Sequence, residues 1–198
     1  QKWRCHDTVA QPVRHPYEAF HAFQLYHNLR YKKEMKLLGI DPGSRVTGYG
    51  IIQTDGHRHR PIDFGAIRLK ATLPFPERLD AIHSGILERI EQHTPEAVIL
   101  ETQFMARNAN SALKLGMAKG AALLAATRNR IPIFEYAPTK VKLAVVGTGR
   151  GSKHQVQHMT KMLLGLRDMP QPEDAADALA IAICHAHMVT RPLIRGVA

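Results

Sequence analysis

The sequence has few cysteines, few aromatic residues and no long apolar run. Only two of its 198 residues are cysteines, Cys5 and Cys184, and neither has metal-ligand spacing around it. This argues against a disulfide framework and favours a reducing, cytosolic setting. No apolar run approaches the ~20 residues of a transmembrane helix, and the first ten residues lack the apolar segment of a signal peptide. We therefore expect a cytoplasmic protein with no membrane segment.

Acidic residues are scarce relative to basic ones. The chain has 27 Lys and Arg against 17 Asp and Glu, which gives a formal net charge of +10. Residues 1–34 hold six basic and three acidic residues, so they contribute +3 and leave +7 for residues 35–198. A charge of this sign favours a polyanionic partner, most simply nucleic acid. Charge alone does not distinguish this from a basic protein without such a partner.

Residues 1–34 differ in pattern from the rest of the chain. They show no strand alternation, and the spacing of their four histidines, His6, His15, His21 and His27, matches no standard metal site. Met35 then opens a regular pattern. We expect residues 1–34 to be an N-terminal extension, as a docking helix, a disordered arm or translation from an upstream start. Residues 35–190 should form one folded domain, and residues 191–198 a C-terminal tail.

From Met35 onward the periodicity predicts an α/β fold. Three short apolar segments separated by turn-rich residues are typical of an antiparallel meander. Helical and strand-like segments alternate after them, which is typical of parallel strands joined by crossover helices. The predicted strands are 36–40, 48–54, 61–70, 96–101 and 131–136, and the predicted helices cover 75–94, 108–130, 152–165 and 173–188. The order predicts a mixed sheet, three antiparallel strands then parallel strands, flanked by helices.

Two predicted strands end in a carboxylate. LLGID closes on Asp41 and AVILE on Glu101, and parallel neighbours would bring both acids to the sheet edge where open α/β folds place their sites. Asp174 and Asp177 are three residues apart at a helix start, so they share a helix face in the first turn. Singly, each acid is more often a helix cap or a solvated strand end. Together they would repel one another unless neutralised, and hard oxygen ligands suit Mg²⁺ or Mn²⁺.

Four segments resemble the RuvC family of Holliday-junction resolvases, in the family's order: LGIDPGSRVTGYGII, ETQFMARNANSALKLGMAKGAAL, QVQHMTKMLL and PEDAADALAIAICHAH. The resemblance implies an RNase H-like nuclease domain, a homodimer, and paired nicking of opposing strands of four-way DNA junctions in recombination and repair. It also implies a partnership with the RuvA–RuvB branch-migration complex. The family's catalytic and metal-binding tetrad falls on Asp41, Glu101, Asp174 and Asp177. These residues would hold two Mg²⁺ ions about 3.5–4 Å apart, with Mn²⁺ as a substitute.

The same resemblance assigns residues to DNA binding. Phe104, which pattern alone would place in the core, would stack on a base at the opened junction, typically worth ~1–3 kcal/mol. Lys142, Arg150 and Lys153, in and beside the glycine-rich VVGTGRGSK, would contact phosphates rather than form a solvated basic loop. Arg107, Lys114 and Lys119 would extend this basic surface. The small residues of SALKLGMAKGAALLAA would form part of the dimer interface, or else pack on the chain's own sheet.

The chain departs from the family pattern beside the catalytic glutamate, where the usual Glu-Gln is Glu101-Thr102-Gln103. Two other functions stay open on sequence grounds. One is an RNase H-like nuclease that cuts RNA–DNA hybrids or ordinary branched DNA by the same chemistry. The other is a non-catalytic junction-binding module, against which the intact acid set argues, because binding a polyanion needs no cluster of carboxylates.

Overall fold

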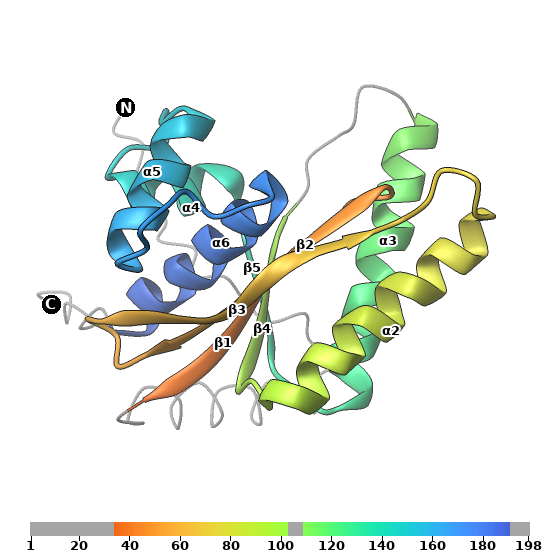
Figure 1. Cartoon of the computed structure of the whole chain (residues 1–198), viewed down its shortest axis with the longest axis horizontal. Coiled ribbons are helices and arrows are strands. Elements are labelled where there is room, and N and C mark those ends of the chain that lie inside the picture. Colours follow the sequence, from red (N-terminus) through yellow and green to blue (C-terminus); the bar gives the residue numbers. More distant parts are fainter. Residues whose placement is uncertain (1–33, 103–108, 191–198) are drawn as a thin grey trace, which may run out of the picture.

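The computed structural model describes residues 34–102 and 109–190 (Figure 1). Three sequence expectations fall largely or wholly outside these ranges: the extension at 1–34, of which only Glu34 is described, the aromatic Phe104, and the tail at 191–198. The described elements run from Met35 to Thr190. No helix in the described ranges is both long enough and apolar enough to cross a membrane.

A five-stranded mixed sheet forms the centre of the fold, with strand order β3-β2-β1-β4-β5. The first three strands pair antiparallel, and β1, β4 and β5 run parallel, which confirms the predicted arrangement. The strands are β1 (Met35–Asp41), β2 (Val46–Thr54), β3 (His59–Arg68), β4 (Ala97–Glu101) and β5 (Ile133–Tyr136). Because β1 is central and β4 lies beside it, their carboxyl ends meet in the middle of one sheet edge.

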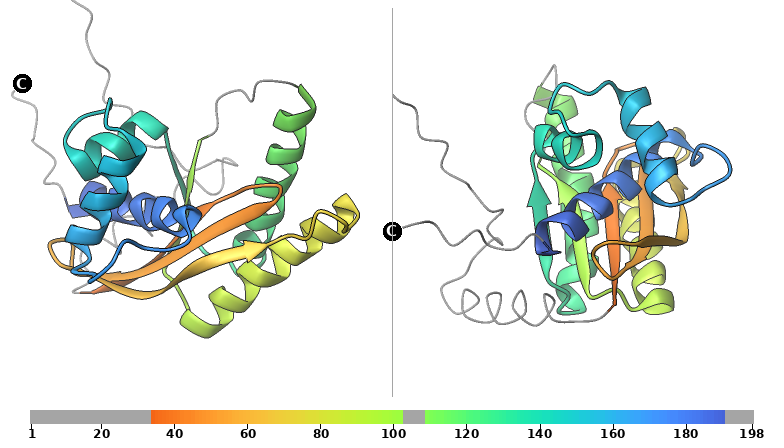
Figure 2. Two further views of the ribbon diagram at one scale, coloured as in Figure 1. Left: turned by 45° about the horizontal axis from the view of Figure 1, so that its top comes forward. Right: turned by 90° about the vertical axis from the view of Figure 1, so that its left-hand side faces the viewer.

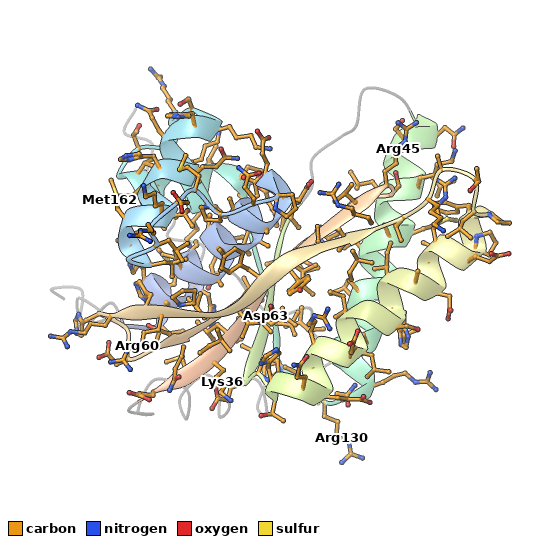
Figure 3. The ribbon with its side chains drawn as sticks, viewed as in Figure 1. Lys36, Arg45, Arg60, Asp63, Arg130 and Met162 are labelled. Atoms are coloured by element: carbon orange, nitrogen blue, oxygen red, sulfur yellow. The ribbon has the colours of Figure 1, made fainter. Side chains whose placement is uncertain are left out.

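Helices cover both faces of the sheet (Figures 1 and 2). One face carries α2 (Phe75–His93) and α3 (Ala109–Arg128), and the other carries α4 (Pro138–Val146), α5 (Lys153–Leu163) and α6 (Glu173–Thr190). Apolar residues at helical spacing bury the inner side of α2 through Ile82, Ile86 and Ile90, as the sequence predicts. The sheet therefore separates two apolar clusters. Charged side chains such as Arg60 and Arg130 extend outward from these layers (Figure 3).

Helix α4 is absent from the sequence prediction, which treats the chain between the last strand and residue 152 as a loop. Its signals are present but short. Pro138 stands at the start of the helix, where a proline is tolerated, and Val141 and Val145 are buried four residues apart. A nine-residue segment next to a glycine-rich stretch gives too little periodicity for a confident helix prediction. The omission matters because α4 carries Lys142.

Glycines in β1 and β2 let α6 lie directly on the sheet. A Cβ added to Gly39 would stand 2.0 Å from the carbonyl oxygen of Ala178, and one added to Gly48 would stand 2.0 Å from that of Asp174. Gly50 likewise faces Leu179, whose backbone nitrogen would be 2.8 Å away. The glycines of LLGID and TGYGII thus fix the distance between the strands and the helix that bears two of the predicted acids.

A chain of hydrogen bonds joins the β2–β3 hairpin to α6 and α4. His187 Nδ1 lies 3.0 Å from the Ala144 carbonyl, the Nε2 atoms of His59 and His187 are 3.0 Å apart, and the Thr54 hydroxyl is 2.7 Å from His59 Nδ1. A carbonyl only accepts, so His187 donates from Nδ1 and, when neutral, accepts at Nε2 from His59. His59 then accepts from Thr54. The chain is therefore fully satisfied when both rings are neutral.

Acidification is expected to destabilise the fold through His59. Burial, and next the nearby His187, lower the pKa of His59 from 6.5 to about 4. The unfolded state therefore binds a proton first, so this stability is present above pH 6.5 and is lost as the pH falls from there toward 4. At about 1.4 kcal/mol per pH unit, the parent should lose on the order of 2 kcal/mol of its free energy of unfolding through His59 between pH 7 and pH 5. His59→Gln should not show this loss.

Urea unfolding of the parent and of His59→Gln at several pH values measures this difference. His57→Gln is the matched control, because His57 is exposed in the same hairpin; it should keep the parent's dependence. An identical pH profile for the parent and His59→Gln would contradict the prediction.

Candidate active site

Strand alternation brings Asp41 and Glu101 to the same face of the sheet. In β1, Leu38 and Ile40 belong to the apolar cluster under α2 and α3, whereas Leu37 belongs to the cluster under α6. Asp41 therefore follows Leu37 and Gly39 on the α6 face. Glu101 follows Ala97 and Ile99 on that face by the same alternation. Both faces of each strand are buried, which agrees with its apolar residues. The acid stands at the last position of each strand, where the burial becomes partial.

Helix α6 supplies the two remaining acids. Its backbone at Asp174 lies over Gly48, which pairs with Asp41 across β1 and β2, so Asp174 is close to the end of β1. Asp177 lies one turn further along the helix. The expectation that both acids occupy the first turn is wrong for Asp177, because the helix begins at Glu173 and a turn spans 3.6 residues. The two acids still share the face that lies on the sheet edge.

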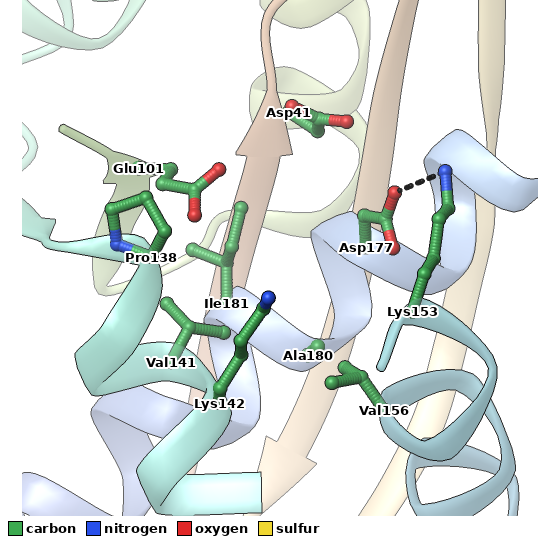
Figure 4. Close-up of a pocket in the computed structure, with 10 residues that line it drawn as sticks. All are labelled: Asp41, Glu101, Pro138, Val141, Lys142, Lys153, Val156, Asp177, Ala180 and Ile181. Carbon is green, nitrogen blue, oxygen red and sulfur yellow. Dashed lines mark ion pairs between the residues drawn. The ribbon is translucent and has the colours of Figure 1, made fainter. Parts of the chain in front are cut away.

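Three of the four acids border one cavity of about 240 Å³ (Figure 4). Asp41 and Glu101 line it from the strand ends, and Asp177 lines it from α6. Its other walls are apolar or basic and come from α4, α5 and α6: Pro138, Val141, Lys142, Lys153, Val156, Ala180 and Ile181. Asp174 is not part of the lining, although its charge acts on Asp41. The apolar wall was not predicted, since it joins residues of three helices, one of which, α4, the sequence did not predict.

The acids raise one another's pKa. Burial, and then the charges of Asp177, Glu101 and Asp174, raise the pKa of Asp41 from 3.8 to about 7. Burial is the first cause for Glu101 as well, followed by repulsion from Asp177, and Lys142 opposes both effects. The pKa of Asp177 is also raised, first by burial, although its contact with Lys153 lowers it. Carboxylates that resist ionisation in this way favour a bound cation.

Two of the three predicted basic residues lie at the cavity. Lys153, at the start of α5, contacts Asp177 Oδ2 at 3.0 Å and Glu173 Oε2 at 3.1 Å; Figure 4 shows the Asp177 contact. Although burial lowers the pKa of Lys153, its hydrogen bonds to the two carboxylates raise it. Lys142 extends into the cavity from α4, the helix that precedes the glycine-rich loop (Figure 4). Arg150 does lie in that loop, exposed and outside the cavity lining.

Other predicted residues do not meet at the site. Phe104 and Arg107 lie outside the described residues, so the structure places neither. Lys119 is mostly buried and pairs with Glu135, which contradicts its predicted role in an exposed basic surface. Glu173, the first residue of α6, contacts Lys153.

The chemistry of the acids fits a hard divalent cation. Four carboxylates supply only oxygen donors, the type that Mg²⁺ and Mn²⁺ prefer, and the raised pKa values of Asp41, Glu101 and Asp177 indicate that the protein alone does not neutralise these three. Within the described ranges, no three or more His, Cys, Asp or Glu side chains are already close enough together to hold a metal ion. Asp41, Glu101 and Asp177 therefore border one cavity without a preassembled coordination shell among the described residues.

A mixed sheet of this order, with carboxylates at its central edge and more on a helix packed over it, defines an RNase H-like nuclease. A family model described as crossover junction endodeoxyribonuclease RuvC matches residues 37–185. The chain belongs to this family, whose nucleases depend on metal for activity. It is 54% identical over 152 residues to the RuvC of Protochlamydia amoebophila, with 77% of this chain and 90% of that protein covered.

Solved structures agree with this membership. The Thermus thermophilus RuvC structure is 38% identical and matches with a TM-score of 0.72, covering 77% of this chain and 94% of that one. The same organism's RuvC in complex with a Holliday junction substrate is 37% identical and has a TM-score of 0.74, with 79% and 97% covered. The expected RNase H-like fold is therefore confirmed.

Proposed function

We propose that this protein resolves four-way DNA junctions by metal-dependent nicking of opposing strands, in recombination and repair. The observation that carries the proposal is the meeting of Asp41, Glu101, Asp174 and Asp177 at one sheet edge. Membership of the RuvC family and the similarity to a junction-bound relative support the choice of substrate. The formal charge of +10 agrees with a nucleic-acid substrate.

In this proposal the four acids hold two Mg²⁺ ions, and Mn²⁺ substitutes for Mg²⁺. When bound, the metal supplies activation of a water for attack on phosphorus and stabilisation of the leaving 3′ oxygen. Lys142 lines the cavity, which supports a contact with the phosphate that is cut. Lys153 pairs with Asp177 in the free protein and becomes available to a second phosphate when that contact opens. Arg150 contacts the DNA backbone further from the cut.

A substrate panel tests this function. The protein is incubated with a mobile four-way junction, an RNA–DNA hybrid and a linear duplex, with Mg²⁺, with Mn²⁺ and with EDTA. We expect paired nicks in the junction only, with either metal and not with EDTA. Preferred cleavage of the hybrid would replace the proposal with the other RNase H-like activity, and binding without any cleavage would reduce it to a binding module.

Phe104→Ala should lower the cleavage rate more than the junction affinity. In the proposal Phe104 stacks on a base where the junction opens, a contact worth ~1–3 kcal/mol, while many phosphate contacts supply most of the binding. A tenfold or greater loss of single-turnover rate with a Kd within about threefold of the parent is expected. Phe104→Trp, which keeps the stacking surface, is the control. A parental rate for Phe104→Ala would contradict the assignment.

We also propose that the protein is a homodimer formed through α3. Leu113, Met117 and Leu124 are 59%, 44% and 50% exposed, and their spacing places them along one side of the helix. Gly116 and Gly120 have nothing within 4 Å of an added Cβ, so a second helix could approach closely. The buried side of α3 is instead lined by alanines. Two active sites related by a two-fold axis would suit the symmetry of a junction.

Leu113→Glu combined with Met117→Glu should convert the dimer into a monomer. Light scattering after size exclusion gives the mass, and a supercoiled cruciform plasmid separates paired from single nicks. We expect a monomeric mass and single nicks. Leu143→Glu is the matched control, because Leu143 is similarly exposed, at 54%, but lies on α4. A dimeric mass for the double variant would place the interface elsewhere.

Family membership supports three further assignments. We propose that residues 35–190 form the nuclease domain, since the family model matches 37–185 within it, and that residues 1–34 and 191–198 are an extension and a tail. We also propose that the protein works with a RuvA–RuvB branch-migration complex in the cytoplasm.

Because residues 1–34 precede the range that the family model matches, a chain that begins at Met35 should keep junction cleavage.

A further inference from the structure

We propose that Lys119 is a positioning residue for Glu101 and acts from the opposite face of the sheet. The proposal rests on the catalytic role proposed above for Glu101. Lys119 belongs to α3, and its ammonium lies 2.7 Å from Glu135 Oε2 and 3.4 Å from the carbonyl oxygen of Glu101. The side chains of Lys119 and Glu135 are only 16% and 19% exposed.

Two contacts hold the peptide unit that follows Glu101. Its carbonyl oxygen faces Lys119, and its N–H, which belongs to Thr102, donates to the Tyr136 carbonyl at 2.8 Å. With both ends of the peptide engaged, its plane is fixed relative to β5 and α3. That plane sets the backbone of Glu101, and hence the direction in which its side chain leaves the strand. Removing the ammonium would free one of the two ends.

Glu135 keeps the ammonium in place. It lies on β5 next to Leu100 of β4 in the parallel pairing, so Lys119 bridges a helix and the ends of two adjacent strands. Strand alternation sends the Glu101 side chain to the α6 face, whereas Lys119 belongs to the α3 layer. Lys119 therefore acts through the backbone and does not reach substrate or metal.

Three variants test the role. Lys119→Met removes the ammonium and keeps most of the stem, Lys119→Arg keeps the charge and its donors, and Arg128→Met removes the charge of an exposed arginine on the same helix. The measurements are single-turnover cleavage of a four-way junction, the Mg²⁺ concentration at half-maximal rate, and junction Kd in EDTA. Amide hydrogen exchange at Thr102 is measured without metal or DNA.

For Lys119→Met we expect a cleavage rate lower by about 10- to 100-fold, the effect of a displacement near 1 Å at a reacting centre. The half-maximal Mg²⁺ concentration should rise, the Kd should stay within about twofold of the parent, and Thr102 should exchange faster. Lys119→Arg should restore rate and exchange, and Arg128→Met should match the parent. If Lys119→Met does not fold, Lys119→Gln is held to the same expectations.

Parental cleavage and parental Thr102 exchange in a folded Lys119→Met or Lys119→Gln variant would overturn the inference. A rate loss without faster exchange, or one that Lys119→Arg does not reduce, would overturn it as well. Inactivity of the parent would refute the proposed function instead, and Thr102 exchange would still decide whether Lys119 holds this peptide.

Discussion

Asp41→Asn is expected to abolish junction cleavage and, in metal-free buffer, to make the protein more stable than the parent. Asparagine keeps the size of the side chain and removes the charge that would hold a cation, so the rate should fall by at least about 10³-fold, as for other groups that act as a unit. Junction affinity should be unchanged or higher, because a negative charge near a phosphate is removed.

The stability gain follows from the raised pKa. Asp41 has a pKa of about 7 in the fold against an ordinary value of 3.8, so the folded state holds this proton more tightly than the unfolded state. The parent's stability therefore falls as the pH rises from about 4 through 7. Asparagine does not ionise, and at about 1.4 kcal/mol per pH unit the variant should gain on the order of 4 kcal/mol at pH 8.

Urea unfolding in EDTA at pH 5 and pH 8, together with cleavage and gel-shift assays, measures these effects. The gain at pH 5 should be clearly smaller than at pH 8. Glu101→Gln, Asp174→Asn and Asp177→Asn should also lose cleavage, and any pair of these changes should be hardly worse than one. Cleavage near the parental rate by Asp41→Asn or Glu101→Gln would refute the nuclease site.

Gly39→Val should destabilise the whole domain and inactivate what remains folded. The first atom of any side chain at Gly39 would lie 2.0 Å from the Ala178 carbonyl oxygen and 2.9 Å from the Ala182 nitrogen. These are backbone atoms of α6, so only movement of the helix relieves the contact. Overpacking of this kind costs about 3 kcal/mol or more. The movement would also carry Asp174 and Asp177 away from Asp41.

Urea unfolding and cleavage in excess Mg²⁺ test this expectation. Gly149→Ala is the control, since its nearest contact would be the Thr139 carbonyl oxygen at 3.4 Å, and it should unfold like the parent. Parental stability of Gly39→Val would mean that α6 does not rest on β1 as described.

The mixed sheet and the central acids could be predicted from the sequence because the signals of the separate strands are local. LLGID and AVILE are apolar on both faces, which marks central strands, and their terminal acids follow the same alternation. The meander of short segments before the first long helix likewise predicted the antiparallel part of the sheet. The family motifs then placed Asp174 and Asp177 on the last helix.

The remainder depends on distances that no local pattern contains. Helix α4 is too short for clear periodicity, so its part of the apolar wall of the cavity and the position of Lys142 were missed. Lys119 lies in a helix of mixed polarity, and only the fold shows that it meets Glu135 rather than solvent. The ion pair between Lys153 and Asp177 joins α5 to α6 and could not be predicted from either segment.

The alternation of β1 and β4 makes the site depend on residue count as much as on residue type. Successive side chains of a strand point to opposite faces of the sheet. The acid of each strand therefore stays on the α6 face only if the number of residues between it and the buried, paired residues of the strand does not change by one. Losing or gaining one residue in LLGID or AVILE would turn the carboxylate toward α2 and α3, among apolar side chains and away from the other acids. Such a change could leave composition, charge and strand propensity almost unaltered. Length variation in this protein is therefore tolerable in the loops that join its elements, and not within these two strands.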